Sequence, residues 1–500
     1  MNEFIDRCLT KTISLKKVIF VSLFSILCLI SCIHFGHRLF SERKTGTEIL
    51  ENKNSLQKVL SQKKLRVVLD YNTFNYFIYK GEPMGFYYEL LKAFCDENEI
   101  RLEIIDQQKW AASVRGLMNE TYDLVAKNTI PVVNVPQIDC TEPLALSHVV
   151  LVQHQPVSVI DNGGDETSDG FVKYRNELKG KKVFVPQNSD FGYLLKLLSN
   201  DIGGITIVED SLHTTEQLLK KVATREIDYT VCDENSLAAM KQHFPDLDFS
   251  TTIRFGRNLC WALANESLAL KNYLNEWILA FKKTSKYEEI YARYFSVQAD
   301  GRFRDGEYNS FLGGQLSEFD DLVKEVSAYY HWDWRLISSI IFQESRFDVH
   351  ARSFTGARGL MQLMPNIIRL YKVANPAEPR ENIRAGVAYL TYLDQLFLPV
   401  IADKTERLKF VLASYNIGVG HVMDARKLAM KFDKDPSVWE DNVDYFLKNK
   451  TSSMFSDDPI VKWGGCRGEE SVNFVFDVLN YYYHYLNIFP PGDRNSLAEL

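Results

Sequence analysis

The chain has 500 residues, which is too long for one ordinary domain of about 100–200 residues. Hydrophobic residues make up 46% and charged residues 25%, which excludes a largely disordered or fibrous chain. The mean hydropathy of -0.20 excludes a polytopic membrane protein, and the net charge of -7 gives no electrostatic footprint for nucleic acid. Residues 1–44 are nevertheless basic, so the rest of the chain carries the acidic excess.

Residues 1–36 have the order of an export signal, in which basic residues up to Lys17 precede an apolar run from Val18 to Phe35. Within this run, residues 29–32 resemble a bacterial lipobox, which predicts that Cys32 is the lipidated first residue of the mature chain. The alternative is an uncleaved anchor helix, because a run of about 18 residues is at the lower limit for a membrane span. Both interpretations predict a protein of the cell envelope that faces the periplasm and is held at a membrane. The outer membrane is favoured over the inner membrane.

Residues 37–63 are polar and are predicted to form a tether. The cysteines beyond the signal region are widely spaced, odd in number and without CxxC pairs, so no zinc site is predicted. Buried free thiols are favoured over one disulfide. These cysteines are Cys95, Cys140, Cys232, Cys260 and Cys466.

Between residues 64 and 297, short β-rich runs alternate with helical segments. The predicted strands are residues 66–71, 101–105, 122–126, 148–153, 182–185, 205–208, 229–232 and 259–263. The clearest predicted helices are residues 87–97, 191–198 and 215–224. This alternation predicts an α/β domain with mostly parallel sheets.

The strand signal ends after residue 297. Residues 298–316 are rich in glycine and charge and are predicted to be a linker, and residues 491–500 to be a tail. Residues 317–490 are predicted to form a mainly α-helical domain, with helices over 319–330, 334–343, 359–364, 384–396, 408–415 and 471–486.

One predicted helix carries a carboxylate on an apolar face. Asp333 can cap its start, and the side chains of one face are then Ile337, Ile340, Ile341 and Glu344. Burial and the helix C-terminus both disfavour the charged form of Glu344 and raise its pKa. Such an acid can hold its proton near neutral pH and act as a general acid. On spacing alone, a glutamate that turns into solvent at the helix end is the other interpretation.

Four motifs occur in order from this acid onward. They are residues 344–347 (ESRF), 353–365 (SFTGARGLMQLMP), 382–390 (NIRAGVAYL) and 413–418 (ASYNIG). The series resembles the lysozyme-like lytic transglycosylases, the soluble lytic transglycosylase domain of glycoside hydrolase family 23. The resemblance implies a lysozyme-like fold for residues 317–490. It also implies glycan strands of peptidoglycan as the substrate.

The same resemblance implies a reaction at the β-1,4 bond between N-acetylmuramic acid and N-acetylglucosamine. Glu344 matches the family's single catalytic acid/base. It would protonate the glycosidic oxygen and then help the muramic 6-hydroxyl to attack, which leaves a 1,6-anhydro end. An ordinary glycosidase needs a second carboxylate, and the 353–365 motif contains none. Asp348 is better explained as a turn residue.

Other motif positions match residues that line the saccharide groove or pack beside the acid. The groove positions are Ser353, Gln362, Tyr415 and Asn416. Leu360 and Met361 match positions beside the acid, with ordinary core packing as the alternative. The late motif 470–475 departs from the family, because Phe474 stands where a tyrosine is usual and a hydroxyl near Glu344 or the substrate is lost.

The α/β part resembles the extracellular solute-binding proteins of the amino-acid-binding type, family 3. The matching stretches are residues 65–68, 85–90, 122–125, 178–183 and 227–233. The resemblance implies a two-lobed periplasmic-binding-protein domain that closes around a ligand. In the amino-acid binders an arginine grips the ligand carboxylate, but the corresponding stretch Thr129–Pro136 contains no arginine.

The candidate ligand residues of this domain are few. Asp233 matches a position that holds the ligand amino group, Ser189 lies in a second-lobe loop, and Tyr76 and Phe77 could stack on a ligand. Without the arginine, a free amino acid is not favoured as the ligand. A peptide or muropeptide, such as a cell-wall stem peptide, and a vestigial lobe that serves as a spacer are the two alternatives.

Together the two resemblances predict a multidomain chain, a membrane-anchored peptidoglycan lyase whose first domain regulates the second through ligand occupancy. The alternative is a non-enzymatic envelope receptor or scaffold that binds cell-wall fragments. Glu344 favours the lyase, and the tyrosine missing at position 474 favours the scaffold. No metal site or nucleotide loop is predicted, so no cofactor is expected, and no nucleic acid is expected as a partner.

Overall fold

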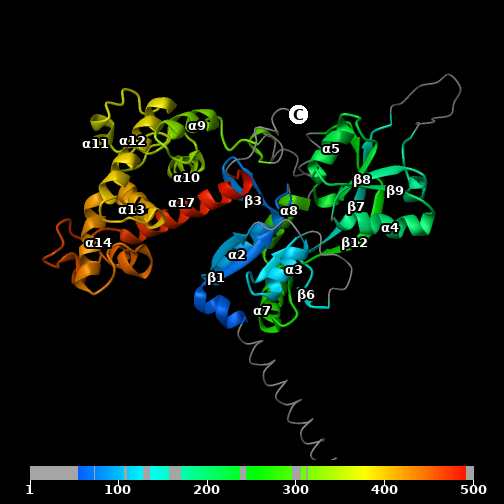
Figure 1. Cartoon of the computed structure of the whole chain (residues 1–500), viewed down its shortest axis with the longest axis horizontal. Helices are drawn as coiled ribbons and strands as arrows, with labels where there is room; N and C mark the ends of the chain where they lie inside the picture. The colour runs from blue at the N-terminus through cyan, green and yellow to red at the C-terminus, as the bar shows by residue number, and fades with distance from the viewer. Residues whose placement is uncertain are drawn as a thin grey trace, which may run out of the picture.

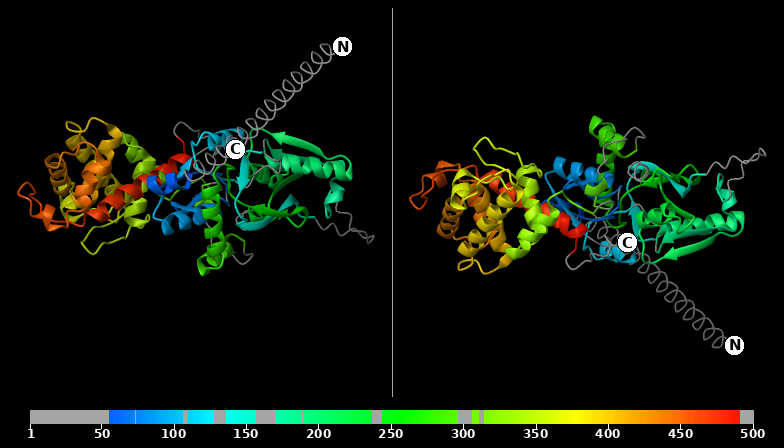
Figure 2. Two further views of the ribbon diagram at one scale, coloured as in Figure 1. Left: turned by 90° about the horizontal axis from the view of Figure 1, so that it is seen from below. Right: turned by 90° about the horizontal axis from the view of Figure 1, so that it is seen from above.

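The computed structural model describes residues 55–72, 74–105, 110–127, 136–156, 170–187, 189–236, 244–295, 306–310 and 314–490. The predictions about the signal segment, Cys32, most of the tether, nearly all of the stretch 129–136 and the tail lie outside these residues. Within them, no helix combines the length and the apolar character that crossing a membrane requires. Figures 1 and 2 show an α/β part and a helical part, with helix α17 (Gly468–Ile488) reaching from one to the other.

The first lobe of the α/β part contains a five-stranded sheet in the order β4-β1-β5-β13-β6. Its strands are β1 (Lys64–Leu69), β4 (Arg101–Ile105), β5 (Leu124–Ala126), β6 (Ile138–Cys140) and β13 (Ala262–Ala264). Strand β1 is parallel to β4 and β5, whereas β13 is antiparallel to β5 and β6. The helices of this lobe are α2 (Phe86–Glu97), α3 (Trp110–Met118), α7 (Leu268–Phe281) and α8 (Ser285–Phe295).

The second lobe contains a sheet in the order β11-β7-β10-β8-β9, with β12 paired to β7. Its strands are β7 (Ala145–His154), β8 (Lys182–Pro186), β9 (Thr206–Asp210), β10 (Tyr229–Asp233), β11 (Leu247–Asp248) and β12 (Thr252–Leu259). The helices are α4 (Asp190–Ile202) and α5 (Thr215–Ala223). Strand β8 is parallel to β9 and β10, but β7 is antiparallel to β10, β11 and β12.

The two-lobed α/β domain is therefore confirmed, but the prediction of mostly parallel sheets is wrong. Strands β7 and β12 carry the chain from one lobe to the other and back, so they run in opposite directions and pair antiparallel. The predicted strand 259–263 is divided for the same reason, because β12 ends at Leu259 in one sheet and β13 begins at Ala262 in the other.

The helical part is confirmed as mainly α-helical. Its helices are α9 (Asp320–Tyr329), α10 (Trp334–Ser345), α11 (Pro365–Leu370), α12 (Pro379–Phe397), α13 (Lys404–Ile417), α14 (Val419–Lys431), α15 (Asp444–Lys448), α16 (Ser453–Ser456) and α17. The predicted helix 359–364 is wrong, since Gly359 and Gln362 have positive φ angles of 77° and 44° and the next helix begins only at Pro365. Helix α14 was not predicted, because Gly418 and Gly420 interrupt the pattern at its start.

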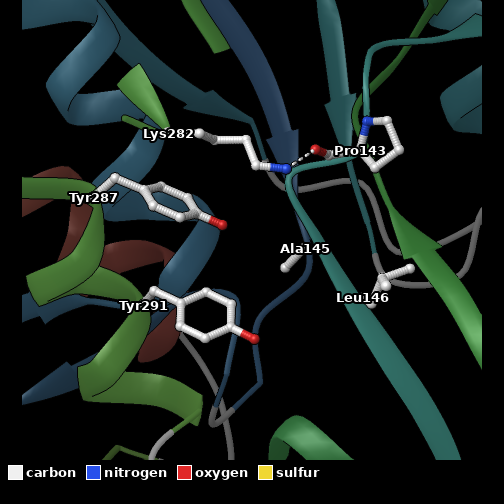
Figure 3. A pocket seen from close by; sticks show the side chains of 6 residues that line it. All are labelled: Pro143, Ala145, Leu146, Lys282, Tyr287 and Tyr291. Atoms are coloured by element: carbon white, nitrogen blue, oxygen red, sulfur yellow. Dashed lines mark hydrogen bonds between the residues drawn. The ribbon is translucent and has the colours of Figure 1, made fainter. Parts of the chain in front are cut away.

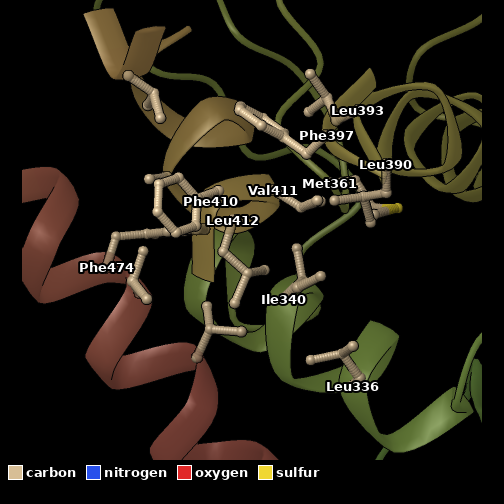
Figure 4. Close-up of a cluster of buried hydrophobic side chains, with 14 of the residues drawn as sticks. Leu336, Ile340, Met361, Leu390, Leu393, Phe397, Phe410, Val411, Leu412 and Phe474 are labelled. Atoms are coloured by element: carbon tan, nitrogen blue, oxygen red, sulfur yellow. The ribbon is translucent and has the colours of Figure 1, made fainter. Parts of the chain in front are cut away.

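A single apolar cluster holds the helices of this part together (Figure 4). Side chains from α10, α12, α13 and α17 meet there, among them Ile340, Leu390, Phe410 and Phe474. Since Ile340 is fully buried in this cluster, the helix that carries Glu344 is fixed by packing along its length.

The described part of the predicted linker is ordered against a hairpin of the first lobe. The hairpin consists of β2 (Phe77–Tyr79) and β3 (Glu82–Met84). Asn309 forms an isolated bridge with Tyr79, and the backbone N–H of Ser310 donates to the carbonyl oxygen of Ile78 at 2.9 Å. These residues therefore extend the hairpin.

The C-terminal helix α17 docks on the same hairpin. The hydroxyl of Tyr485 donates to the carbonyl oxygen of Gly81 at 2.7 Å, and His484 hydrogen-bonds to Tyr76. An ideal Cβ built on Gly81 would lie 2.7 Å from ring atoms of both Phe342 and Phe347. The hairpin therefore touches the turn at the end of the helix that bears Glu344.

The contact between Tyr76 and His484 predicts a dependence of stability on pH. Burial, together with the nearby Lys92, lowers the pKa of His484 to about 3. The unfolded state then binds more protons below about pH 6.5, so the free energy of unfolding falls as the pH falls from 6.5 toward 3. At pH 4.5 this contribution amounts to about 2–3 kcal/mol. Urea unfolding of the wild type and of His484→Gln, across this range, measures the difference. Parallel pH profiles of the two proteins would contradict the prediction.

Candidate active site

Glu344 lies in the last turn of α10. The Asp333 carboxylate accepts from the backbone N–H of Arg335 at 2.9 Å, which confirms the predicted cap, and Arg346 ends the helix in a left-handed conformation. The Glu344 side chain is partly buried, and burial raises its pKa to about 8. Among the described residues, no charged side chain contributes to this shift. Burial therefore favours the protonated carboxylic acid of Glu344 at neutral pH.

Tyr415 lies beside this acid. Its hydroxyl donates to the carbonyl oxygen of Met361 at 2.7 Å, and its pKa is raised by burial and also by Glu344. The ring of Tyr389 is 5.6 Å away from that of Tyr415. The neighbouring Asn416 is exposed, near the end of α13. The fourth motif thus places the ring of Tyr415 next to Glu344, and the third motif contributes the neighbouring ring of Tyr389.

Hydrogen bonds among its own polar groups stabilise the loop of the second motif. Backbone hydrogen bonds of 3.1 Å and 3.0 Å join Arg358 and Leu363. The Ser353 hydroxyl accepts from the backbone N–H of Ala357 at 2.9 Å. The Gln362 amide donates to the carbonyl oxygens of Gly359 and Ala351 at 2.9 Å and 3.1 Å. Ser353 and the amide nitrogen of Gln362 therefore hold the loop in shape.

The side chain of Asn382 holds this loop in place through hydrogen bonds. The sequence did not single out Asn382 as a site residue. Its side chain is fully buried. It accepts from the backbone N–H of Met361 at 2.8 Å and donates to the carbonyl oxygens of Arg358 and Pro376 at 3.0 Å and 2.8 Å. The sequence held one sign of this role, because Asn382 is the first residue of the third motif. Its hydrogen bonds to the loop of the second motif become visible only in the structure.

Replacing Asn382 with alanine is expected to lower the free energy of unfolding by about 2–3 kcal/mol, because the buried N–H of Met361 loses its partner and two partly buried carbonyl oxygens each lose a donor. The loop beside Glu344 should loosen as well, so turnover should fall more than the loss of folded protein explains. The matched control is Asn366→Ala, an exposed position on α11. Urea unfolding and activity at a temperature where both variants are folded separate the two effects. Equal losses in the two variants would contradict the role given to Asn382.

Three further predicted residues of this domain lie in the apolar core. Leu360 and Met361 are fully buried, and Phe474 is 6% exposed in the apolar cluster of Figure 4. Gly386 of α12 leaves room for Met361, since an ideal Cβ there would lie 2.4 Å from its sulfur. Asp348 is exposed and accepts from the backbone N–H of His350 at 2.8 Å, as a turn residue does.

In the α/β domain, Asp233 belongs to a buried charged cluster. Arg257 of β12 lies 2.7 Å from Asp190 and 3.1 Å from Asp233. Burial raises the pKa of the Tyr87 hydroxyl on α2, and the nearby Arg257 and Asp233 also affect this pKa. The solute-binding domain thus has a buried arginine near its candidate ligand residue Asp233. This arginine is Arg257 of β12, whereas the family resemblance places one in residues 129–136. Two aspartates already bind its guanidinium.

The other candidate ligand residues have different surroundings. Ser189 precedes α4, and its hydroxyl donates to the carbonyl oxygen of Pro186 at 2.6 Å. Tyr76 and Phe77 are both 0% exposed. The prediction that these two rings stack on a ligand is corrected, because both side chains belong to the apolar core of the first lobe and the hydroxyl of Tyr76 is bonded to His484.

A pocket of about 300 Å³ lies at the start of β7, away from Glu344 (Figure 3). Tyr287 and Tyr291 of α8 line one side, and Lys282 donates to the carbonyl oxygen of Pro143 at 2.9 Å. In the part of the chain that the structure describes, no group of three or more His, Cys, Asp or Glu side chains could hold a metal ion.

Comparisons with known proteins agree with this arrangement. The family model described as "Transglycosylase SLT domain" matches residues 321–438, and that of "Bacterial extracellular solute-binding proteins, family 3" matches residues 65–297. The chain is 30% identical over 430 residues to a membrane-bound lytic murein transglycosylase F of Desulfosudis oleivorans, with 86% of this chain and 91% of that protein covered. A protein of the same name from Pseudomonas fluorescens is 29% identical over 440 residues, covering 87% of each chain.

Among solved structures, the chain is similar to a mutant of ArgBP from T. maritima, with 19% identity and a TM-score of 0.41 over 48% of this chain and 99% of that one. The fold and the site together define a two-domain peptidoglycan lytic transglycosylase, with a solute-binding domain ahead of the catalytic one. The chain belongs to the membrane-bound lytic murein transglycosylase F family.

Proposed function

We propose that the protein cleaves the β-1,4 bond between N-acetylmuramic acid and N-acetylglucosamine without water and leaves 1,6-anhydro ends. The observation that carries this proposal is the environment of Glu344, whose pKa burial raises to about 8. A hydrolase that works with two carboxylates needs a second one near the first. Among the described residues, no other carboxylate contributes to the pKa shift of Glu344. A single acid/base fits this site best.

The reaction uses Glu344 twice. At neutral pH its carboxylic acid donates a proton to the glycosidic oxygen, and the N-acetylglucosamine side leaves with that proton. The carboxylate that forms then accepts the proton of the muramic 6-hydroxyl as this oxygen bonds to the anomeric carbon. Glu344 ends protonated, so one residue completes the cycle.

Digestion of purified sacculi, with the products separated by mass, tests this proposal. Anhydro-ended muropeptides from the wild type, which are lost in Glu344→Gln and retained in Asp348→Asn, are the expected result. Asp348 is a suitable control because it is an exposed carboxylate four residues along the chain. Reducing-end products would mean a hydrolase. Folded wild type without products would support the scaffold alternative, which the phenylalanine at position 474 favours.

We further propose that ligand occupancy of the solute-binding domain modulates the lyase. The hairpin of the first lobe provides the contact, since Gly81 packs against Phe342 and Phe347, which lie on either side of Glu344. A movement of the hairpin in the first lobe would therefore press on the turn that ends the helix carrying Glu344. A cell-wall stem peptide is the proposed ligand, and Asp233 and Arg257 are the proposed binding residues.

Turnover of sacculi is measured with and without purified stem peptides, over a concentration range that saturates binding. A change in turnover that follows the binding curve, and that Asp233→Asn shifts to higher peptide concentration, supports the proposal. Equal turnover across that range would exclude it and would favour a spacer role for the domain.

The membrane anchor is proposed to be a lipid on Cys32, with an uncleaved helix as the alternative. A fatty-acid label that is incorporated in cells and lost in Cys32→Ala supports the lipid. Membrane retention of the unlabelled variant supports the helix.

A further inference from the structure

Cys140 and Cys260 lie side by side in the first lobe, although the whole second lobe separates them in the chain. Cys140 of β6 pairs with Ala262 of β13, and the backbone N–H of Thr141 donates to the carbonyl oxygen of Trp261 at 2.9 Å. Cys260 lies two residues before Ala262, between the end of β12 and the start of β13. The two thiols are within hydrogen-bonding range of each other.

The two thiols differ in exposure and in charge. Cys140 is partly exposed, and its hydrogen bond with Cys260 lowers its pKa, helped by Lys271. Lys271 is held nearby by Asp139 at 2.9 Å. Cys260 is 8% exposed, and its hydrogen bond with Cys140 and its burial raise its pKa. Cys140 is therefore suited to attack as a thiolate, while Cys260 keeps its proton until later.

We propose that Cys140 and Cys260 form a disulfide in the exported protein. The inference rests on the proposed export, because disulfides persist in oxidising compartments. The oxidant is a disulfide compound, such as oxidised glutathione or the disulfide of a thiol oxidoreductase. The Cys140 thiolate attacks it and forms a mixed disulfide, releasing one thiolate. Cys260 then loses its proton, attacks the Cys140 sulfur and releases the second. Two electrons and two protons pass to the oxidant, which leaves as two thiols.

The position of this bond gives it a structural consequence. Strand β7 begins five residues after Cys140, β12 ends immediately before Cys260, and Leu259 pairs with Ala145 across the two strands. The disulfide therefore joins the bases of both connections between the lobes. It also closes a loop that contains the entire second lobe, and a long loop restricts the unfolded chain strongly.

The test uses the full-length wild-type protein, equilibrated with graded ratios of oxidised to reduced glutathione, quenched with acid and alkylated. After alkylation, the oxidised protein is expected to carry two fewer alkyl groups per molecule than the reduced protein, as measured by intact mass. Digestion without reductant should then yield one linked pair of peptides that contains Cys140 and Cys260. The midpoint of thermal unfolding should rise by roughly 5 °C or more and return on reduction.

Two variants check the assignment. Cys140→Ser should lose the linked peptides and the redox-dependent shift in midpoint, whereas Cys466→Ser, at a partly buried position in the helical part, should keep both. Full alkylation of both thiols in wild-type protein under the most oxidising ratio would overturn the proposal. A glutathione adduct on Cys140 with Cys260 left free would also overturn it. Because mass is the readout, failure here leaves the lyase proposal untouched.

Discussion

Glu344→Gln is expected to release anhydro-muropeptides from sacculi roughly 100- to 10,000-fold more slowly than the wild type, the range that removal of a general acid/base usually gives. Glutamine keeps the shape of the side chain but cannot donate the proton or take it back. The fold should be retained, since the amide avoids the cost of a buried charge. Initial rates of product release, measured by mass, give the ratio.

The pH dependence of wild-type activity is a second test of the role of Glu344. Because burial raises the pKa of Glu344 to about 8, the acid form predominates at neutral pH. The value of kcat/KM should therefore fall as the pH rises through about 8. Asp348→Asn should show the same profile. A fall already between pH 4 and 5 would mean that Glu344 titrates like an exposed carboxylate, and it would contradict the burial of this site.

Gly359→Ala is expected to destabilise the protein by about 2–5 kcal/mol, the largest effect on stability that we anticipate from a single methyl group. Gly359 has a φ angle of 77°, where an L-residue is strained. In addition, an ideal Cβ would lie 2.2 Å from the carbonyl oxygen of Pro376 and 2.3 Å from the amide nitrogen of Asn382. The substitution therefore strains the backbone and also displaces the side chain that supports the loop beside Glu344.

Gly314→Ala is the matched control, because its φ angle is 73° but an added Cβ would meet nothing within 4 Å. Only the backbone cost of about 1–2 kcal/mol is expected there. The difference between the two variants in urea unfolding measures the collision alone. If both lost the same free energy of unfolding, the close approach at Gly359 would not matter.

Local pattern was sufficient for much of this molecule. The cap at Asp333 and the apolar face of α10 depend on residues within a few turns of one another, so the sequence could predict them. Most predicted strands were found in nearly the same places for the same reason.

The features that were missed depend on distant residues. Arg257 reaches Asp233 from another strand, and Asn382 supports a loop that precedes it in the chain. Tyr76 and Phe77 were predicted as residues that could stack on a ligand, but both belong to the apolar core of the first lobe. The predicted helix 359–364 failed because two left-handed residues interrupt an otherwise helical pattern.

Helix α17 belongs to the helical domain in sequence, but its end packs against the solute-binding domain. The whole helix lies beyond the residues that the transglycosylase family model matches, 321–438, and its last turns share buried contacts with the first lobe. Tyr485 is fully buried there, although it belongs to the catalytic half. A catalytic fragment cut free at the linker would therefore carry an exposed aromatic surface that favours aggregation.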